Sequence, residues 1–373
     1  MNNHSTKVHL CILYREIHGN EKNNINLKSE PFSITLHRLE GIHPRLESVQ
    51  GIRNIIKKFR PNHILLEFDP ASKLVNDVIY YGKKINSNMN ISCIVLENRR
   101  KTYLKDAFTA LFKGKLKLFI GNLLCEYFNR NAIKHVSYLF PISRESCDVY
   151  SNLNFNTNRI QQVPLGIDEK LFVSRSNNFK SKIRKKLKLN SFTIAYFGRL
   201  VPEKGIKYLI QSLSILKFDD WQLLIDSFDT YKSNFSKEIK ELIFSNGLEK
   251  KIVFFDANHE KMPDYYSAVD LLVLPSIETP YFKEQYGRVL VEAMLTKTMV
   301  IGSNTGAIPE ILSSKYLIFK SGCSNSLAEK INDIKMLNKK SKKEIINQNY
   351  LRAFNFLTSK NQAKEIFNIL KNN

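Results

Sequence analysis

The residues best suited to chemistry lie in one stretch, ETPYFKEQYGRVLVEAMLTKTMVIGSNTGAIPEIL, from Glu278 to Leu312. It holds two glutamates, Glu284 and Glu292, with a single glycine, Gly287, between them. The pattern predicts that a helix begins near Gly287, where the missing side chain lets backbone amides approach an anion. Each carboxylate can then accept hydrogen bonds at one end of a ligand whose anionic middle lies on the helix N-terminus. Taken alone, the same residues also fit one dipole-compensating glutamate and one surface glutamate.

A second candidate stretch is GRLVPEKG, from Gly198 to Gly205. Gly198 allows a sharp turn, and Arg199 and Lys204 then flank the start of a helix. A forked guanidinium and an ammonium group beside free backbone amides form a good clamp for a diphosphate. The alternative is a surface turn with two solvated basic residues.

The elements that must position these residues alternate between apolar runs and amphipathic helices, the pattern of an α/β fold with parallel sheets. In the second half of the chain we expect strands over residues 192–198, 221–225, 251–256, 271–276 and 298–303. Both candidate stretches directly follow such strands, where open parallel sheets bind their ligands. We therefore predict doubly wound, Rossmann-like domains that face each other across a cleft.

The 373-residue chain is too long for one ordinary core, so more than one domain is expected. The predicted parts are an N-terminal domain over residues 1–165, a C-terminal domain over 166–345 and a helical segment over 346–373 that packs back on the first domain. Within the first domain, the periodicity predicts one long helix over residues 104–127.

The net charge of +22 favours an anionic partner: nucleic acid, an anionic membrane surface or a phosphorylated substrate. A compositional bias toward Lys, Asn and Ile explains the excess equally well. The segment Arg99–Lys117 interleaves basic residues with Leu and Phe. It is either a membrane-surface helix or a helix packed on the N-terminal sheet with a solvated basic face. No nucleic-acid-binding module is recognised, so we expect no specific nucleic acid partner.

Cysteine usage and apolar runs bear on location. The five cysteines are scattered without zinc-ligand spacing, and no window reaches eighteen apolar residues. We therefore expect reduced thiols, no metal site, no signal peptide and no transmembrane helix. The expected location is the cytoplasm, either free or at the inner face of the cell membrane.

Five motifs occur in an order typical of one enzyme family: VPLGIDEKLF, YFGRLVPEKG, DLLVLPS, EQYGRVLVEAM and GAIPEI. This set resembles the interdomain segment and donor-binding domain of retaining GT-B glycosyltransferases of family 4. The resemblance is specific from about Tyr138 to Leu312 and loose before that. It implies a nucleotide-diphosphate sugar as donor, bound mainly by the C-terminal domain, with no cofactor and no metal required.

The resemblance also implies a role for each candidate residue. Arg199 and Lys204, after the turn at Gly198, hold the diphosphate. Glu292 binds the ribose hydroxyls, Glu284 holds the donor sugar, and the nucleobase lies near Asn258. The backbone amides that complete the donor site belong to Gln285, Tyr286, Gly287, Arg288 and Val289. The expected catalytic residues, which stabilise the leaving group or hold the sugar, are Arg199, Lys204 and Glu284.

The N-terminal half departs from the family pattern. Where the family often has a His after a middle strand, the apolar run ISCIVL leads into Glu97 and Asn98. We place these two residues on the acceptor side, together with Glu67, which ends another apolar run.

The expected activity is a retaining glycosyltransferase of class EC 2.4. It moves a sugar to a glycan or a polyprenyl-diphosphate-linked saccharide, in bacterial surface polysaccharide synthesis. Two alternatives stay open: a non-catalytic sugar-nucleotide or glycan-binding protein on the same scaffold, and a basic nucleic-acid-binding protein. Release of free nucleoside diphosphate separates the enzyme from the binding protein.

Overall fold

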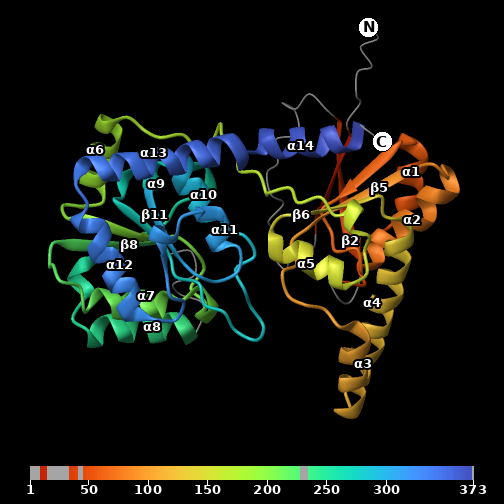
Figure 1. Cartoon of the computed structure of the whole chain (residues 1–373), viewed down its shortest axis with the longest axis horizontal. Coiled ribbons are helices and arrows are strands. Elements are labelled where there is room, and N and C mark those ends of the chain that lie inside the picture. The colour runs from red at the N-terminus through yellow and green to blue at the C-terminus, as the bar shows by residue number, and fades with distance from the viewer. Residues whose placement is uncertain (1–8, 15–32, 41–44, 227–233, 372–373) are drawn as a thin grey trace, which may run out of the picture. The chain divides into compact units, whose positions relative to one another are not determined.

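The structure is a computed structural model, which describes residues 9–14, 33–40, 45–226 and 234–371 (Figure 1). The chain forms two compact units. Unit 1 comprises residues 1–141 and 148–161, and unit 2 comprises residues 142–147 and 162–373. The predicted division at residues 165 and 345 stays a prediction, as does the packing of segment 346–373 on the first domain.

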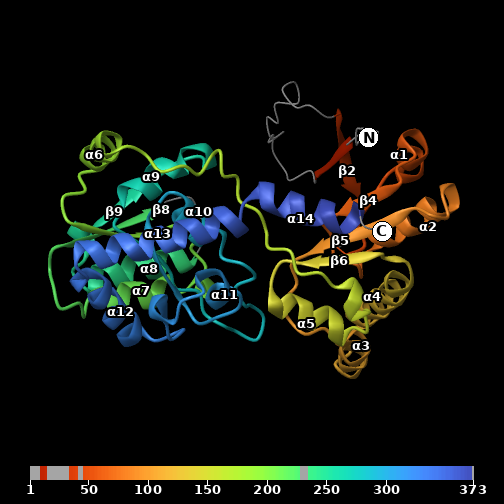
Figure 2. The ribbon, with the colours of Figure 1, turned by 45° about the horizontal axis from the view of Figure 1, so that its top comes forward.

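Unit 1 contains two three-stranded sheets. The first has the order β1-β2-β3, with strands His9–Tyr14 (β1), Ser33–Glu40 (β2) and Ser48–Val49 (β3). The second is parallel and has the order β4-β5-β6 (Figure 2), with strands His63–Leu66 (β4), Asn90–Val95 (β5) and Tyr138–Pro141 (β6). Parallel neighbours need crossover connections, which helices supply here. Helix Lys73–Ile85 (α2) connects β4 to β5, and Tyr103–Phe112 (α3) and Leu116–His135 (α4) connect β5 to β6. Helix Ile52–Phe59 (α1) precedes β4, and Arg144–Asn152 (α5), which begins in unit 2, follows β6.

The single helix that we predicted over residues 104–127 is wrong. Helix α3 ends at Phe112, and α4 begins at Leu116. Gly114 between them has a φ of +67°, a left-handed conformation that no α-helix can continue through. The two helices therefore form a hairpin and pack against each other.

Unit 2 is built on a six-stranded parallel sheet with the order β12-β11-β10-β7-β8-β9. Its strands are Phe192–Tyr196 (β7), Trp221–Asp226 (β8), Ile252–Phe255 (β9), Leu271–Leu274 (β10), Met299–Ser303 (β11) and Ile318–Phe319 (β12). Strands β10 and β11 are buried throughout, which explains why they appear in the sequence as unbroken apolar runs. The sheet confirms the parallel α/β pattern that the sequence predicts.

Helices cover both faces of this sheet (Figure 1). Their bounds are Asn177–Lys186 (α6), Ile206–Leu213 (α7), Asn234–Ser245 (α8), Met262–Ala268 (α9), Arg288–Leu295 (α10), Ile308–Leu312 (α11), Ser324–Met336 (α12), Lys339–Phe356 (α13) and Ser359–Lys371 (α14). Strands β7, β8 and β9 extend the sheet in one direction, and β10, β11 and β12 extend it in the other. The order therefore reverses between β7 and β10, and such a switch point is where doubly wound sheets bind ligands.

Gly205 holds the loops after β7 and β10 together at this switch point. Its φ is +72°, and a Cβ atom added to it would lie 1.8 Å from the carbonyl oxygen of Pro275. Close by, the amide of Ile277 donates a hydrogen bond of 2.9 Å to the carbonyl of Glu203. Only glycine allows this approach of two backbones, so the relative position of the two loops depends on it.

The segment VPLGIDEKLF, Val163–Phe172, is fixed to the C-terminal helices of unit 2. The amide of Ile167 donates to Leu357 O at 3.0 Å, and the amide of Ser359 donates back to Ile167 O at 2.9 Å. A Cβ atom at Gly166 would lie 2.4 Å from the Cα atom of Ser359. The segment therefore lies directly on the junction between α13 and α14.

Gly205→Ala tests the contact between the two loops. The matched control is Gly247→Ala, because Gly247 has a φ of +63° but no atom within 4 Å of an added Cβ. We expect the control to lose about 1–2 kcal/mol of unfolding free energy through backbone strain alone. Gly205→Ala should lose about 1–3 kcal/mol more, because the added carbon overpacks the loops. Denaturant unfolding measures both, and equal losses would show that the loops do not depend on this contact.

Candidate functional site

The site lies where the loops after three neighbouring strands of unit 2 converge. These loops follow β7, β10 and β11, which lie side by side in the sheet. The amide of Ala307 donates to the carbonyl of Glu284 at 3.0 Å, and Gly306 lies so close that an added Cβ would reach that carbonyl at 2.0 Å. With the contact at Gly205, these bonds hold all three loops in one rigid arrangement.

A buried ion pair joins the loops after β7 and β10. Lys204 Nζ lies 2.6 Å from Glu284 Oε2, and the Ser276 hydroxyl donates to the same oxygen at 2.6 Å. The Glu284 side chain is only 8% exposed and that of Lys204 18%. Burying a carboxylate is costly unless it is paired and hydrogen-bonded, and here it is both. The ammonium carries three N–H groups, so Lys204 can still donate to a ligand.

The N-terminus of α10 supplies a row of backbone donors next to this pair. Gly287 is the N-cap residue, with a φ of +88° and no side chain to cap the helix. Among the described residues, no acceptor is found for the backbone amides from Gln285 to Val289. These amides carry the positive end of the helix dipole, so the arrangement suits an anion.

The side chain of Tyr286 has a different role from its amide. It is buried, and its hydroxyl donates a 2.7 Å hydrogen bond to the carbonyl of Leu165. This bond ties the start of α10 to the segment that packs on α13 and α14. Only the backbone of Tyr286 is therefore left to meet a ligand, as the motif predicts.

Glu292 lies one turn farther along α10 and is 5% exposed. The Tyr266 hydroxyl donates to Glu292 Oε2 at 2.6 Å, and Arg288 Nε lies 3.9 Å from Oε1. Burial raises the pKa of Glu292, against the opposing effects of the Tyr266 hydrogen bond and of the Arg288 charge. The pKa of Tyr266 is itself raised well above its usual value by burial, so this hydroxyl keeps its proton and remains a donor.

The other donor-side candidates lie on the surface of the same unit. Arg199 is exposed, and its carbonyl accepts a 2.7 Å bond from the Tyr196 hydroxyl. Gly198 precedes it, two residues after the end of β7. Asn258 is also exposed, and its side chain caps a short 3₁₀ helix by accepting from the amide of Lys261. Their roles toward a ligand stay predictions.

In unit 1, the predicted acceptor-side residues follow β4 and β5. Glu97 accepts from Lys101 Nζ at 2.6 Å and from the amide of Arg99 at 3.1 Å. Burial acts to raise its pKa, but the hydrogen bond and charge of Lys101 outweigh burial and lower it. Asn98 is buried and Glu67 is exposed. The structure therefore places a carboxylate that stays ionised at the end of β5.

Several site residues were missed from the sequence. Asp69, two residues after Glu67, is the enclosed carboxylate of that loop: burial raises its pKa, against the charge of Arg45. Ser276 and Tyr266 hold the two donor-side glutamates. Ser276 ends the apolar run LLVLPS, and a hydroxyl at the end of a predicted strand could have been included in the predicted site. Tyr266 lies in another helix, and no local pattern connects it with Glu292.

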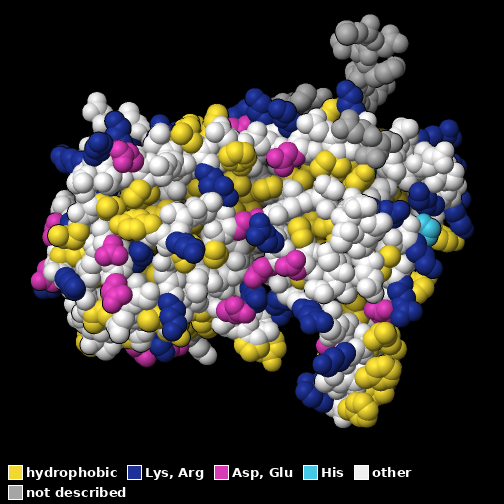
Figure 3. Space-filling model, viewed as in Figure 1, with side chains coloured by type: hydrophobic (Ala, Val, Ile, Leu, Met, Phe, Trp, Pro, Cys, Tyr) yellow, Lys and Arg dark blue, Asp and Glu magenta, His cyan; other side chains and the backbone are white. Residues whose placement is uncertain are grey.

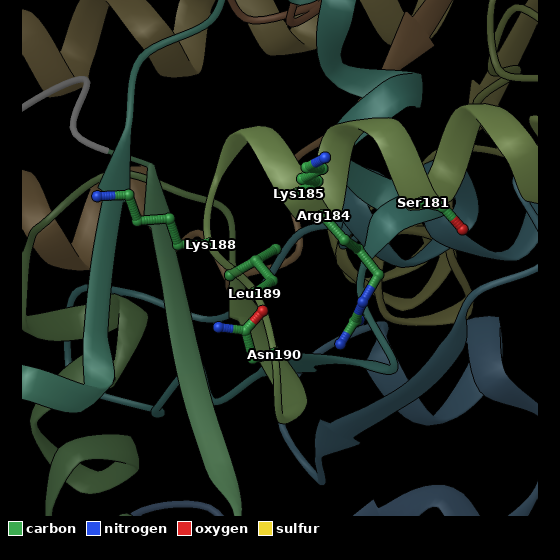
Figure 4. A pocket seen from close by; sticks show the side chains of 6 residues that line it. All are labelled: Ser181, Arg184, Lys185, Lys188, Leu189 and Asn190. Atoms are coloured by element: carbon green, nitrogen blue, oxygen red, sulfur yellow. The ribbon is translucent and has the colours of Figure 1, made fainter.

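A surface depression lies elsewhere in unit 2. Figure 4 shows it at the end of α6, lined by Ser181, Arg184, Lys185, Lys188, Leu189 and Asn190. Its one guanidinium is already engaged, because Arg184 donates to Ala268 O at 2.9 Å and to Ser191 O at 2.7 Å. The depression contains none of the predicted site residues, so we assign it no ligand.

Within the described parts of the chain, no group of three or more His, Cys, Asp and Glu side chains has the arrangement of a metal site. Across the same residues, none of the helices combines the length and the apolar character needed to cross a bilayer.

Comparison with known proteins points to one family. Residues 178–352 match the family described as Glycosyl transferases group 1. The D-inositol 3-phosphate glycosyltransferase of Corynebacterium efficiens is 28% identical over 172 residues, which are 44% of this chain and 39% of that protein. The capsular polysaccharide biosynthesis glycosyltransferase CapM of Staphylococcus aureus is 28% identical over 187 residues, 49% of this chain and 46% of that protein. The chain thus spans less than half of the length of these relatives.

Solved structures extend the likeness to both units. A glycosyltransferase from Rickettsia africae superimposes with a TM-score of 0.75 at 17% identity, over 99% of each chain. The Anabaena protein HepE in complex with UDP-glucose gives a TM-score of 0.68 at 17% identity, over 98% of this chain and 100% of that chain. These likenesses establish the fold, and the predicted pair of Rossmann-like domains of GT-B type is confirmed.

Glu292→Gln tests whether the ionised Glu292 carboxylate stabilises the fold. The raised pKa means that folded Glu292 holds its proton more tightly than an unfolded glutamate does. The wild type therefore loses stability relative to the glutamine variant as the pH rises from about 4.3, the unfolded value, through the folded pKa. We expect the Tm of the variant to equal or exceed that of the wild type at pH 7, with the difference vanishing at lower pH.

Thermal unfolding followed by circular dichroism makes the measurement. Glu260→Gln, which neutralises an exposed glutamate on the same unit, is the matched control and should not change Tm. A Tm of Glu292→Gln clearly below the wild-type value at pH 7 would mean that the ionised carboxylate stabilises the fold, and its burial would then be no argument for a ligand-binding role.

Proposed function

Because residues 178–352 match the family described as Glycosyl transferases group 1 and the chain has the GT-B fold, we propose that the protein transfers a sugar from a nucleoside diphosphate sugar to a saccharide acceptor. The observation that carries this proposal is the N-terminus of α10. Its amides from Gln285 to Val289 meet no acceptor among the described residues, and they lie beside the Lys204–Glu284 pair at a switch point of the sheet. A diphosphate is the ligand group that this set of donors fits.

The diphosphate would be held by charge that the chain itself supplies. The α10 amides provide the helix dipole, Lys204 provides an ammonium with donors to spare, and Arg199 provides an exposed guanidinium on the neighbouring loop. Together they neutralise a leaving diphosphate as charge develops on it, which is the main requirement of the reaction. We therefore propose that no resident metal takes part.

Two glutamates would hold the sugar and the ribose. Glu284 is fixed by Lys204 and Ser276 through a single oxygen, so its orientation is set before the donor arrives. Glu292 is fixed in the same way by Tyr266. Such preorganised acceptors bind vicinal hydroxyls without first having to be ordered. This arrangement favours a front-face reaction with retention of configuration over a covalent role for Glu284, because its carboxylate is already engaged.

The acceptor side is proposed for the loops after β4 and β5. Glu97 and Asn98 follow β5, and Glu67 follows β4, at the carboxyl edge of a parallel sheet. Asp69 joins this group as its enclosed carboxylate. The relative CapM is named for capsular polysaccharide biosynthesis, which supports a glycan or lipid-linked saccharide of the bacterial surface as acceptor.

Lys204→Ala tests the diphosphate site. The loss of one charge-assisted hydrogen bond, about 1.5–3 kcal/mol, should weaken binding of the donor roughly 10- to 100-fold. Isothermal titration with a panel of nucleoside diphosphate sugars measures this. Lys207→Ala is the matched control, since Lys207 lies one turn away, is exposed and pairs with Glu238. Unchanged affinity in Lys204→Ala, or no binding of any donor to the wild type, would contradict the proposal.

The same substitution removes the cationic partner of the buried Glu284 carboxylate, which costs about 3–5 kcal/mol for a buried ion pair. The double variant Lys204→Met with Glu284→Gln removes both charges and should recover most of that loss. It should still fail to bind donor tightly, which separates loss of the site from loss of the fold.

Release of nucleoside diphosphate with transfer to an acceptor then distinguishes an enzyme from a binding protein, and NMR of the product's anomeric proton reports retention.

A further inference from the structure

The hairpin formed by α3 and α4 leaves a large apolar surface uncovered. All eight residues from Leu111 to Leu118 are exposed, and Phe112 at the tip is 89% exposed. Helix α4 becomes buried only farther on, at Cys125, Asn129 and Ala132. The root of the hairpin therefore belongs to the core of unit 1, while the residues at its outer end are exposed.

Apolar side chains are concentrated there. Of the 24 large apolar side chains exposed in the described chain, ten lie on this hairpin: Leu104, Phe108, Leu111, Phe112, Leu116, Leu118, Ile120, Leu123, Leu124 and Tyr127. Figure 3 shows apolar side chains gathered along one side of the projecting end and basic side chains along the other. Scattered apolar residues are normal on a surface, but a continuous set of this size marks an interaction site.

The charges around this surface are almost all positive. Between Tyr103 and Cys125 the chain carries four lysines, Lys105, Lys113, Lys115 and Lys117, and one acidic residue, Asp106, a net charge of 4 − 1 = +3. All four lysines are exposed, and Asp106 already accepts a hydrogen bond from the Thr102 hydroxyl at 3.1 Å. The tip therefore combines exposed phenylalanine and leucine with ammonium groups that are free to reach an anionic surface.

We propose that the α3–α4 hairpin is a membrane-docking element, which buries the Phe112 tip in the interface of a bilayer that carries anionic headgroups. Lysine is depleted in the cores of protein–protein interfaces but is favoured beside apolar residues at lipid interfaces, where its long stem lets the ammonium reach the headgroups. Helix α3 has ten residues and is too short to span a bilayer, so the hairpin lies in the interface.

The place of the hairpin in the chain gives the docking a consequence. Helix α3 starts directly after the loop of Glu97 and Asn98, and its length of roughly 15 Å separates this loop from the tip. A docked hairpin would hold the proposed acceptor-side loop near the membrane surface. This consequence, a lipid-linked acceptor, depends on the proposed function, whereas membrane docking itself does not.

Flotation of the full chain with lipid vesicles tests the docking. The wild type should bind vesicles of 70% phosphatidylcholine and 30% phosphatidylglycerol and bind pure phosphatidylcholine far more weakly. Replacing Lys113, Lys115 and Lys117 together by Gln should weaken binding roughly 100-fold. The matched control replaces Lys182, Lys185 and Lys186 by Gln, which removes the same charge from exposed positions on α6. Equal weakening in both triple variants would show that net charge alone causes binding and would overturn the proposal.

Phe112→Ser tests the apolar part and should weaken binding at least about tenfold. Phe244→Ser, at another exposed phenylalanine in unit 2, is its control and should bind like the wild type. Both variants should keep the wild-type Tm and donor affinity, so failure of docking is distinguishable from failure of the proposed function. Unchanged vesicle binding in Phe112→Ser would overturn the proposal. So would a wild type that ignores vesicles but self-associates through this surface in size-exclusion chromatography.

Discussion

The site in unit 2 depends on the contact between two backbones at Gly205. Without a Cβ atom at this position, the loop after β7 can lie directly on the carbonyl of Pro275 after β10. This approach brings Lys204 within 2.6 Å of Glu284, which lies eighty residues later in the chain. The loop after β11 then closes on the same glutamate through Ala307. A rigid scaffold of this kind can orient side chains before a ligand binds, which lowers the entropy lost on binding.

The same scaffold buries two carboxylates, those of Glu284 and Glu292, although burial disfavours the ionised form of each. Glu284 is compensated by an ion pair and a hydroxyl, so it stays fixed at little net cost. Glu292 accepts from a tyrosine hydroxyl and is otherwise helped only by the charges of Arg288 and His259, and burial raises its pKa. A group that disfavours the folded state in its charged form is a candidate for function, because a packed apolar residue would stabilise the helix better.

Much of unit 2 could be predicted from the sequence because its central strands, such as β10 and β11, are buried and its loops carry glycines. The pattern located five of the six strands, the start of α10 near Gly287 and both glutamates, but it missed the two-residue strand β12. It could not show that Lys204 contacts Glu284, because spacing along a chain fixes the face of one helix or strand but not which loops meet. The contact of Tyr266 with Glu292 could not be predicted for the same reason, because Tyr266 lies in another helix.

In unit 1 the pattern was less informative. Glu67 and Asp69 are two residues apart, and only the folded chain shows that the second is enclosed while the first is exposed. The break at Gly114 had a local signal, since glycine is a common helix terminator. The apolar periodicity on both sides nevertheless suggested one helix, because the two arms of a hairpin carry the same repeat.

The net charge of +22 does not by itself indicate a function, because the effect of each basic residue depends on where it lies in the fold. At the donor-side residues, Lys204 is largely enclosed and paired with Glu284, so its charge acts at short range, on a ligand in direct contact with it. The lysines at the tip of the α3–α4 hairpin are exposed and flank apolar side chains. Salt screens exposed charges over about 10 Å at 0.1 M ionic strength but screens buried pairs much less. The two sets of basic residues therefore differ in kind: the enclosed lysine fixes geometry, whereas the exposed lysines act at a distance and respond to ionic strength.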